Sequence, residues 1–116
     1  MLTDKQIKDY SDQGYLLVEN VITDTQLKTL QNITYDFIEA SKTVTESNDV
    51  YDLDVAHTAE NPKLTRMKLP HKQHPYFDEI LRNSGVTEVL RDLLGDDATL
   101  LTSKLNTKAP GGGAAV

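Results

Sequence analysis

The spacing of apolar and polar residues predicts four helices. The first opens with Thr3 as its N-cap, carries Gln6 at the third helical position as in a capping box, and ends at Gly14, which accepts a left-handed conformation at low cost. The clearest apolar repeat begins at Leu27 and continues to about Ala40, so one stripe of this helix should face the core. The other two helices are expected to open at His74-Pro75 and to cover residues 86–94.

Three stretches outside these helices have the composition or the alternation of strands. Residues 15–21 are rich in strand formers and almost continuously apolar at their start, which predicts a short buried strand. Residues 64–69 and 98–108 alternate between two faces, as the residues of a strand do. Residues 41–61 lack periodicity and predict a long loop, with a brief strand at 50–53.

This order of elements predicts an α+β fold with an incomplete sheet. At 116 residues the chain has the length of one ordinary domain, and a hydrophobic content of 38% allows only a lean core. The predicted strands are too few for a closed barrel and too far apart in sequence for simple hairpins. Their edges are therefore expected to be open, which offers a route to self-association.

The charge balance and the missing residue types narrow the classes of function. The chain has 18 acidic and 12 basic side chains, a net charge of −6, and no basic cluster, so nucleic acid is not expected as a partner. No apolar run is long enough to cross a bilayer and no signal segment is present, so no membrane partner and a cytoplasmic location are expected. Without cysteine there is no disulfide or thiolate metal site.

Six segments follow one another in an order that is specific as a set. They are residues 2–6, 14–22 (beginning Gly14-Tyr-Leu-Leu-Val), 24–30, 57–64, 70–77 (beginning Pro70-His-Lys-Gln-His) and 103–113 (ending in Pro-Gly-Gly-Gly). In this order they resemble the phytanoyl-CoA dioxygenase family of iron(II)/2-oxoglutarate-dependent oxygenases over nearly the whole chain.

The resemblance implies a particular place in a larger fold. Residues 1–116 would form the N-terminal portion of a single phytanoyl-CoA-dioxygenase-like domain. That portion would supply the helical flank and the first strands of a double-stranded β-helix, a jelly-roll-like architecture that this chain leaves incomplete.

The iron ligands of that family are expected to be missing. In the family a Gly-rich turn is followed by a His-x-Asp motif and, far downstream, by a second histidine; together they hold iron(II) and leave positions open for 2-oxoglutarate and oxygen. This sequence ends at Val116 without a His-x-Asp motif, without the downstream histidine and without the arginine that grips 2-oxoglutarate. No catalytic residue and no metal ligand is therefore assigned, and neither iron(II) nor 2-oxoglutarate is expected to bind this chain alone.

Three residues are assigned to the 2-oxoglutarate side of the site by the same resemblance. Lys68 stands where the family places a basic residue toward the 2-oxoglutarate carboxylate, and Lys104 and Asn106 lie on the strand that precedes the iron motif. A dicarboxylate needs cationic or amide donors in a largely dry pocket. From spacing alone the alternative is a solvent-exposed strand face, which Lys68 would share with Arg66 and Lys104 with Asn106.

The three histidines are weaker candidates for a metal site. His57, His71 and His74 could combine with Asp52 and Asp54, but they lie in loops without the ligand spacing that a helix imposes. They are expected to shape the entrance of a substrate pocket or to face water.

Two functions from different classes follow. The first is a fragment of an iron(II)/2-oxoglutarate-dependent dioxygenase whose complete form hydroxylates an organic small molecule. The alternative is a non-enzymatic truncated domain that acts as a binding or assembly module. A coding region that continues past Val116 into His-x-Asp-like sequence would favour the first, and a stop codon there with a stable product would favour the second.

Overall fold

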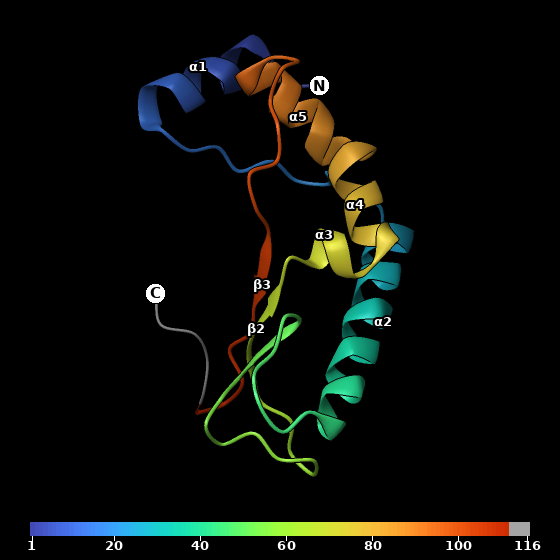
Figure 1. Ribbon diagram of the computed structural model, residues 1–116. Helices are drawn as coiled ribbons and strands as arrows, with labels where there is room; N and C mark the ends of the chain where they lie inside the picture. Colours follow the sequence, from blue (N-terminus) through green and yellow to red (C-terminus); the bar gives the residue numbers. More distant parts are fainter. Residues whose placement is uncertain (112–116) are drawn as a thin grey trace.

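The computed structural model describes residues 1–111, which form helices and one small sheet (Figure 1). The fold is therefore α+β, as predicted, while the double-stranded β-helix stays a prediction. Among the described residues, none of the helices combines the length and apolar content of a membrane span. The elements are α1 (Asp4–Gln13), α2 (Asp24–Ala40), the 3-10 helix η1 (Ser41–Thr43), β1 (Tyr51–Leu53), β2 (Leu64–Lys68), α3 (Pro70–Gln73), α4 (Pro75–Arg82), α5 (Gly85–Leu94) and β3 (Lys104–Asn106).

The four predicted helices are present, and α1 begins and ends as predicted. Thr3 and Thr23 each accept a hydrogen bond from the N–H of the third helical residue, a glutamine whose side chain accepts from the N–H of the cap, so both capping boxes are complete. Gly14 ends α1 with a φ of 81°. The short α3 is missing from the prediction. Pro70 follows directly on a strand pattern, but its fixed φ also suits the first position of a helix, which it occupies.

The prediction of a strand at residues 15–21 is wrong. These residues join no sheet. Asn20 among them has a left-handed backbone with a φ of 58°, and the side chains of Tyr15 and Leu17 are 67% and 81% exposed. The segment runs instead along the start of α5, where a Cβ on Gly85 would lie 2.4 Å from the carbonyl oxygen of Val21. A run of strand-forming residues becomes a β-strand only where another strand lies beside it.

The strand predicted at residues 98–108 is correct only for its second half. Lys104–Asn106 pair with β2, and the ladder extends by one hydrogen bond at each end, from the N–H of Leu69 to Ser103 O and from the N–H of Thr107 to Thr65 O. The first half of the predicted strand has no partner, because β2 ends at Lys68, opposite Lys104.

The three strands form one antiparallel sheet in the order β1-β2-β3. Tyr51, Met67 and Leu105 lie opposite one another across the strands, and Tyr51 and Met67 are only 5% and 2% exposed. The Tyr51 hydroxyl donates to the carbonyl oxygen of Phe37 on α2 at 2.6 Å, and the two rings meet edge to face. This face of the sheet therefore builds the core, which Leu64 and Ile80 complete.

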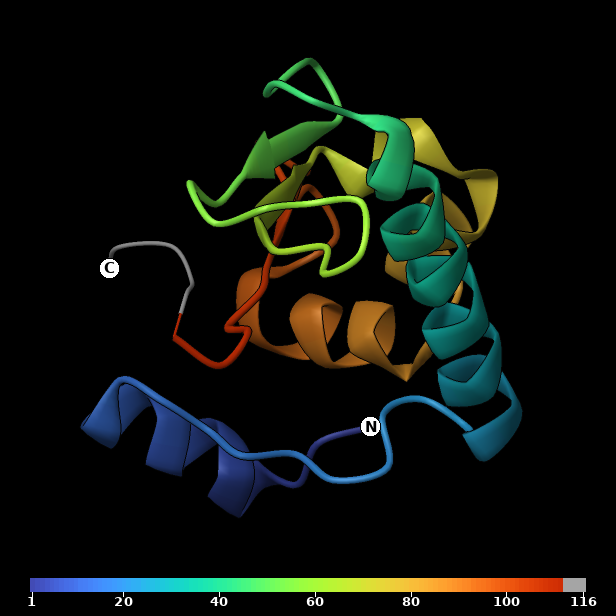
Figure 2. The ribbon, with the colours of Figure 1, turned by 90° about the horizontal axis from the view of Figure 1, so that it is seen from below.

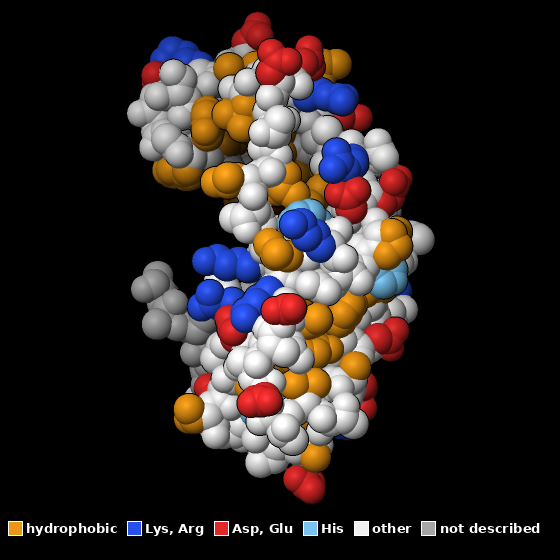
Figure 3. Space-filling model, in the orientation of Figure 1, with side chains coloured by type: hydrophobic (Ala, Val, Ile, Leu, Met, Phe, Trp, Pro, Cys, Tyr) orange, Lys and Arg blue, Asp and Glu red, His pale blue; other side chains and the backbone are white. Residues whose placement is uncertain are grey.

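The molecule is elongated rather than spherical. Its extents are 50 × 27 × 25 Å and its radius of gyration is 16.8 Å, compared with about 13 Å for a compact domain of this length. Both ribbon views place α1 at one end, away from the strands, and α2 along one side of the sheet (Figures 1 and 2). The space-filling view shows a hollow between the two ends of the molecule (Figure 3). Self-association through the sheet edges stays a prediction.

Candidate functional site

The register of the sheet brings the three predicted site residues onto one face. Lys104 lies directly opposite Lys68, and Asn106 lies directly opposite Arg66. Residues two apart on a strand point to the same side, and so do residues directly opposite each other. Arg66, Lys68, Lys104 and Asn106 therefore share the face that points away from the buried Met67, and we name these four residues the cationic face. In Figure 3 Lys and Arg side chains gather over the strands, beside the hollow.

Asp52 on β1 joins this face from the other side of β2. It lies opposite Arg66, with its Oδ2 atom 3.2 Å from Arg66 Nε and its Oδ1 atom 3.1 Å from Lys68 Nζ. Lys68 Nζ also donates to the carbonyl oxygen of Asn48 at 2.8 Å. The side chains of Arg66 and Lys68 are 36% and 38% exposed, so the two cations are half-buried and held, not freely solvated.

One donor on the cationic face has no acceptor. Arg66 Nε is buried, and although Asp52 is within ion-pair distance, the N–H does not point at the carboxylate well enough to make a hydrogen bond. A buried donor without an acceptor is costly. Because protein atoms cover Nε, an anion in the cleft would contact the exposed part of the Arg66 side chain and not this atom. Lys104 is exposed and makes no hydrogen bond or ion pair that the structure of residues 1–111 records.

A cleft of about 440 Å³ opens over this face. It contains three cations and two carboxylates, an arrangement that suits a small anion. Asn106 does not line the cleft, so the structure brings Lys68 and Lys104 together in it and leaves Asn106 at its border, opposite Arg66. The lining residues are Asp49, Asp52, Arg66, Lys68, Leu69, Thr102, Ser103 and Lys104.

Sequence reasoning missed two parts of this arrangement. The sequence offers Asp52 only as a candidate metal ligand, because its position opposite Arg66 depends on the β1–β2 register. Spacing alone favours a solvated face for Arg66, although an arginine that alternates with buried residues on a central strand is a signal that a partner holds it.

The histidines do not form a metal site. The ring of His57 joins two backbone segments, with Nε2 3.0 Å from Ser41 O and Nδ1 accepting from the N–H of Lys63 at 2.9 Å. His74 Nδ1 accepts from the N–H of Tyr76 and caps α4, and His71 contacts the Ser103 hydroxyl. Within residues 1–111 no three His, Asp or Glu side chains are grouped as metal ligands. In the part of the chain that the structure describes, the histidine rings contact backbone groups and a hydroxyl and are not grouped as iron ligands.

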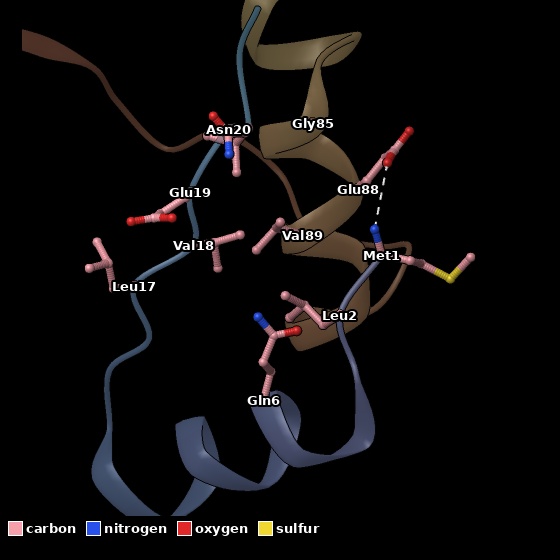
Figure 4. A pocket seen from close by; sticks show the side chains of 11 residues that line it. Met1, Leu2, Gln6, Leu17, Val18, Glu19, Asn20, Gly85, Glu88 and Val89 are labelled. Atoms are coloured by element: carbon pink, nitrogen blue, oxygen red, sulfur yellow. Dashed lines mark ion pairs between the residues drawn. The ribbon is translucent and has the colours of Figure 1, made fainter.

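A second cleft, of about 550 Å³, lies at the other end of the molecule between α1, residues 17–21 and α5 (Figure 4). The amino group of Met1 lies 4.0 Å from Glu88, and the N–H of Leu2 donates to Asp92 at 2.7 Å. Its charged side chains are Glu19 and Glu88, which do not converge on a common point in Figure 4. Residues 1 and 2 and residues 17–21 thus meet α5 at this cleft, and both charged side chains that line it are acidic.

Comparison with known proteins supports the family resemblance of the sequence. The family model for phytanoyl-CoA dioxygenase matches residues 10–116. A probable alpha-ketoglutarate-dependent hypophosphite dioxygenase from Stutzerimonas stutzeri is 27% identical over 109 residues, which are 93% of this chain and 38% of that protein. No solved structure matches significantly. The chain therefore spans well under half the length of this relative, and it belongs to the phytanoyl-CoA dioxygenase family.

Proposed function

We propose that this chain provides the 2-oxoglutarate-binding side of an iron(II)/2-oxoglutarate-dependent dioxygenase. The complete protein would hydroxylate an organic small molecule. Complete members of the family use iron(II) and 2-oxoglutarate, and iron(II) supplies the oxidising chemistry when it is bound. The residues of this chain would hold and orient one carboxylate of 2-oxoglutarate and shield it from water.

The observation that carries the proposal is the convergence of three cations on one cleft. Arg66, Lys68 and Lys104 all line it, and Lys104 is exposed. A carboxylate could accept from Arg66 and pair with Lys104, while Asp52 keeps Lys68 and Arg66 in place. Asn106, opposite Arg66, would contribute an amide donor at the border of the cleft.

The expected affinity of the chain alone is low. Two charge-assisted hydrogen bonds contribute about 1.5–3 kcal/mol each before the cost of ordering, and a net gain of about 4 kcal/mol corresponds to a dissociation constant near 1 mM. The sequence alone predicts no binding of either cofactor. The preformed cationic face leads us to expect weak 2-oxoglutarate binding instead, and still no iron(II) binding.

A titration of the 116-residue chain with 2-oxoglutarate, followed by NMR at low ionic strength, tests this proposal. Lys104→Ala should weaken binding about tenfold or more, the loss of one charge-assisted bond, and Lys68→Ala should weaken it less, because Lys68 is already paired with Asp52. Lys5→Ala removes the same charge from α1, remote from the sheet, and should leave the affinity within about twofold of the original. The uncharged dimethyl ester of 2-oxoglutarate should not bind. Equal losses from Lys5→Ala and Lys104→Ala would show non-specific attraction and refute the site.

A second candidate substrate follows from the relative's name. That protein is named for hypophosphite, a small oxyanion, so an inorganic anion is the alternative to an organic substrate. Titration with hypophosphite in the presence of saturating 2-oxoglutarate separates the two: additive binding indicates a separate substrate position, and competition indicates that both anions use the cationic face.

The non-enzymatic module is the remaining hypothesis. No feature of residues 1–111 favours it over the dioxygenase. Determining the coding sequence beyond Val116 distinguishes the two, because a continuing reading frame with a His-x-Asp motif is expected only for the dioxygenase.

A further inference from the structure

Two like charges face each other at the end of the sheet. Lys68 is the last residue of β2, and it lies directly opposite Lys104, the first residue of β3. Like charges in this position repel, and the last pair of a short ladder frays most easily. Within the described residues β3 pairs only with β2, over three residues. Asp52 and the carbonyl oxygen of Asn48 hold the Lys68 ammonium, so Lys104 is the less restrained of the two, and its place depends on what holds the start of β3.

Contacts beyond the strand ends hold the start of β3 against the end of β2. The backbone of Leu69 adopts a left-handed conformation, with a φ of 48°, which is uncommon for a non-glycine residue. This turn directs the chain into α3 and leaves the Leu69 N–H to donate to Ser103 O at 3.2 Å. The strained residue lies directly beside Lys68, and it also lines the cleft over the cationic face.

The helix α3 then fastens both strands. From α3, Gln73 Nε2 donates to the carbonyl oxygen of Lys68 at 3.1 Å, which ties the helix to the end of β2. His71 Nδ1 contacts the hydroxyl of Ser103, which ties the helix to the start of β3. We name Leu69, His71, Gln73 and Ser103 the strand clasp.

We propose that the strand clasp, through the contact between His71 and Ser103, positions Lys104 beside Lys68 and so sets the anion affinity of the cationic face. His71 does not line the cleft, so it would act through Ser103 and Lys104, both of which do. This inference rests on the proposed function of the face, and it adds His71 as a positioning residue outside the cleft and Ser103 as its link to the start of β3.

Affinity for 2-oxoglutarate in His71 and Ser103 variants tests the proposal. His71→Ala and Ser103→Ala should each weaken binding about three- to tenfold, the size of effect that residues acting through a neighbour produce. Ser103→Thr keeps the hydroxyl and His71→Asn keeps a polar atom near Nδ1, so both should restore most of the affinity. Ser11→Ala, an equal substitution on the exposed side of α1, should change nothing.

A double-mutant cycle separates positioning from general damage to the fold. In a Lys104→Ala background, His71→Ala should have no further effect on affinity, because the residue through which it acts is absent. An undiminished loss in that background would overturn the proposal, since the substitution would then be acting on the cleft as a whole.

Amide hydrogen exchange measured without ligand tests the positioning role separately from the proposed binding site. His71→Ala should speed amide hydrogen exchange at Leu69 and Leu105, whose N–H groups bond across the β2–β3 ladder, by about three- to tenfold and leave exchange in α2 unchanged, because only the end of the sheet is released. Unchanged exchange in β3 would refute the positioning role whether or not 2-oxoglutarate binds. If exchange in β3 responds as expected but the original chain binds no 2-oxoglutarate, then the strand clasp holds the sheet, and both the binding site and its setting of anion affinity are refuted.

Discussion

Replacing Asp52 by asparagine is expected to strengthen anion binding while it weakens the fold. Asp52 is the carboxylate that already occupies part of the cationic face, 3.2 Å from Arg66 Nε and 3.1 Å from Lys68 Nζ. Asparagine has nearly the same shape and no charge. The substitution therefore removes an internal competitor for the cations with the smallest disturbance of packing.

The change in unfolding free energy and the change in anion affinity can both be estimated from the structure. The three side chains are between 29% and 38% exposed, so solvent screens both ion pairs and each contributes no more than about 0.5–1 kcal/mol to folding. The unfolding free energy should thus fall by about 1 kcal/mol. For a bound carboxylate about 6 Å away, removing one like charge in water lowers the energy by about 0.7 kcal/mol, or about threefold in affinity. Physiological salt should reduce this gain to less than twofold.

The assay is an NMR titration with 2-oxoglutarate at low and at physiological ionic strength, alongside urea unfolding. Asp36→Asn, on the exposed surface of α2, makes the same charge change far from the sheet and is the matched control. A weaker affinity in Asp52→Asn, with the control unchanged, would refute the competition. It would mean that orienting Arg66 and Lys68 matters more than the repulsion that Asp52 exerts on the ligand.

Two further predictions concern the scaffold. Tyr51→Phe should lower the unfolding free energy by about 1 kcal/mol, because it removes the hydroxyl bond to Phe37 O, as urea unfolding would show. Burial raises the pKa of Tyr51 above 10.0, so its neutral form is favoured in the folded state; the stability this contributes is full below pH 10 and is lost as the pH rises through the folded pKa. The alkaline loss should shrink in Tyr51→Phe but persist in Tyr35→Phe, which alters a 67% exposed ring; equal profiles would contradict this origin. Gly85→Ala should lower the melting temperature and release residues 17–21, since its Cβ would lie 2.4 Å from Val21 O, and an unchanged melting temperature would contradict that close approach.

Local features were predictable because their causes lie within a few residues. The capping box at Thr3 and the left-handed end at Gly14 each depend on one turn of chain, and both are present. The apolar stripe from Leu27 onward likewise defines α2 without knowledge of its partner. In such cases the side chain and the backbone groups that it contacts lie within a few residues of each other in the sequence.

Features that depend on distant partners were predicted poorly. Residues 15–21 have the composition of a strand but pack along α5, and residues 98–103 alternate but have no strand beside them. The pairing of Lys68 with Lys104 depends on the β2–β3 register, and the approach of Asp52 depends on β1, which is only three residues long. The candidate residues were therefore predictable by resemblance, whereas their mutual arrangement and the unsatisfied Arg66 Nε were not.

The most direct test of the central claim is to map 2-oxoglutarate onto the assigned NMR spectrum of the 116-residue chain. All four residues of the cationic face should show amide shifts that fit a single dissociation constant in the millimolar range; they are Arg66, Lys68, Lys104 and Asn106. Signals of α1 and of the cleft beside Glu88 should stay in place. Shifts spread over all the cationic side chains, or confined to α1 and α5, would contradict the assignment of the cationic face as the 2-oxoglutarate site.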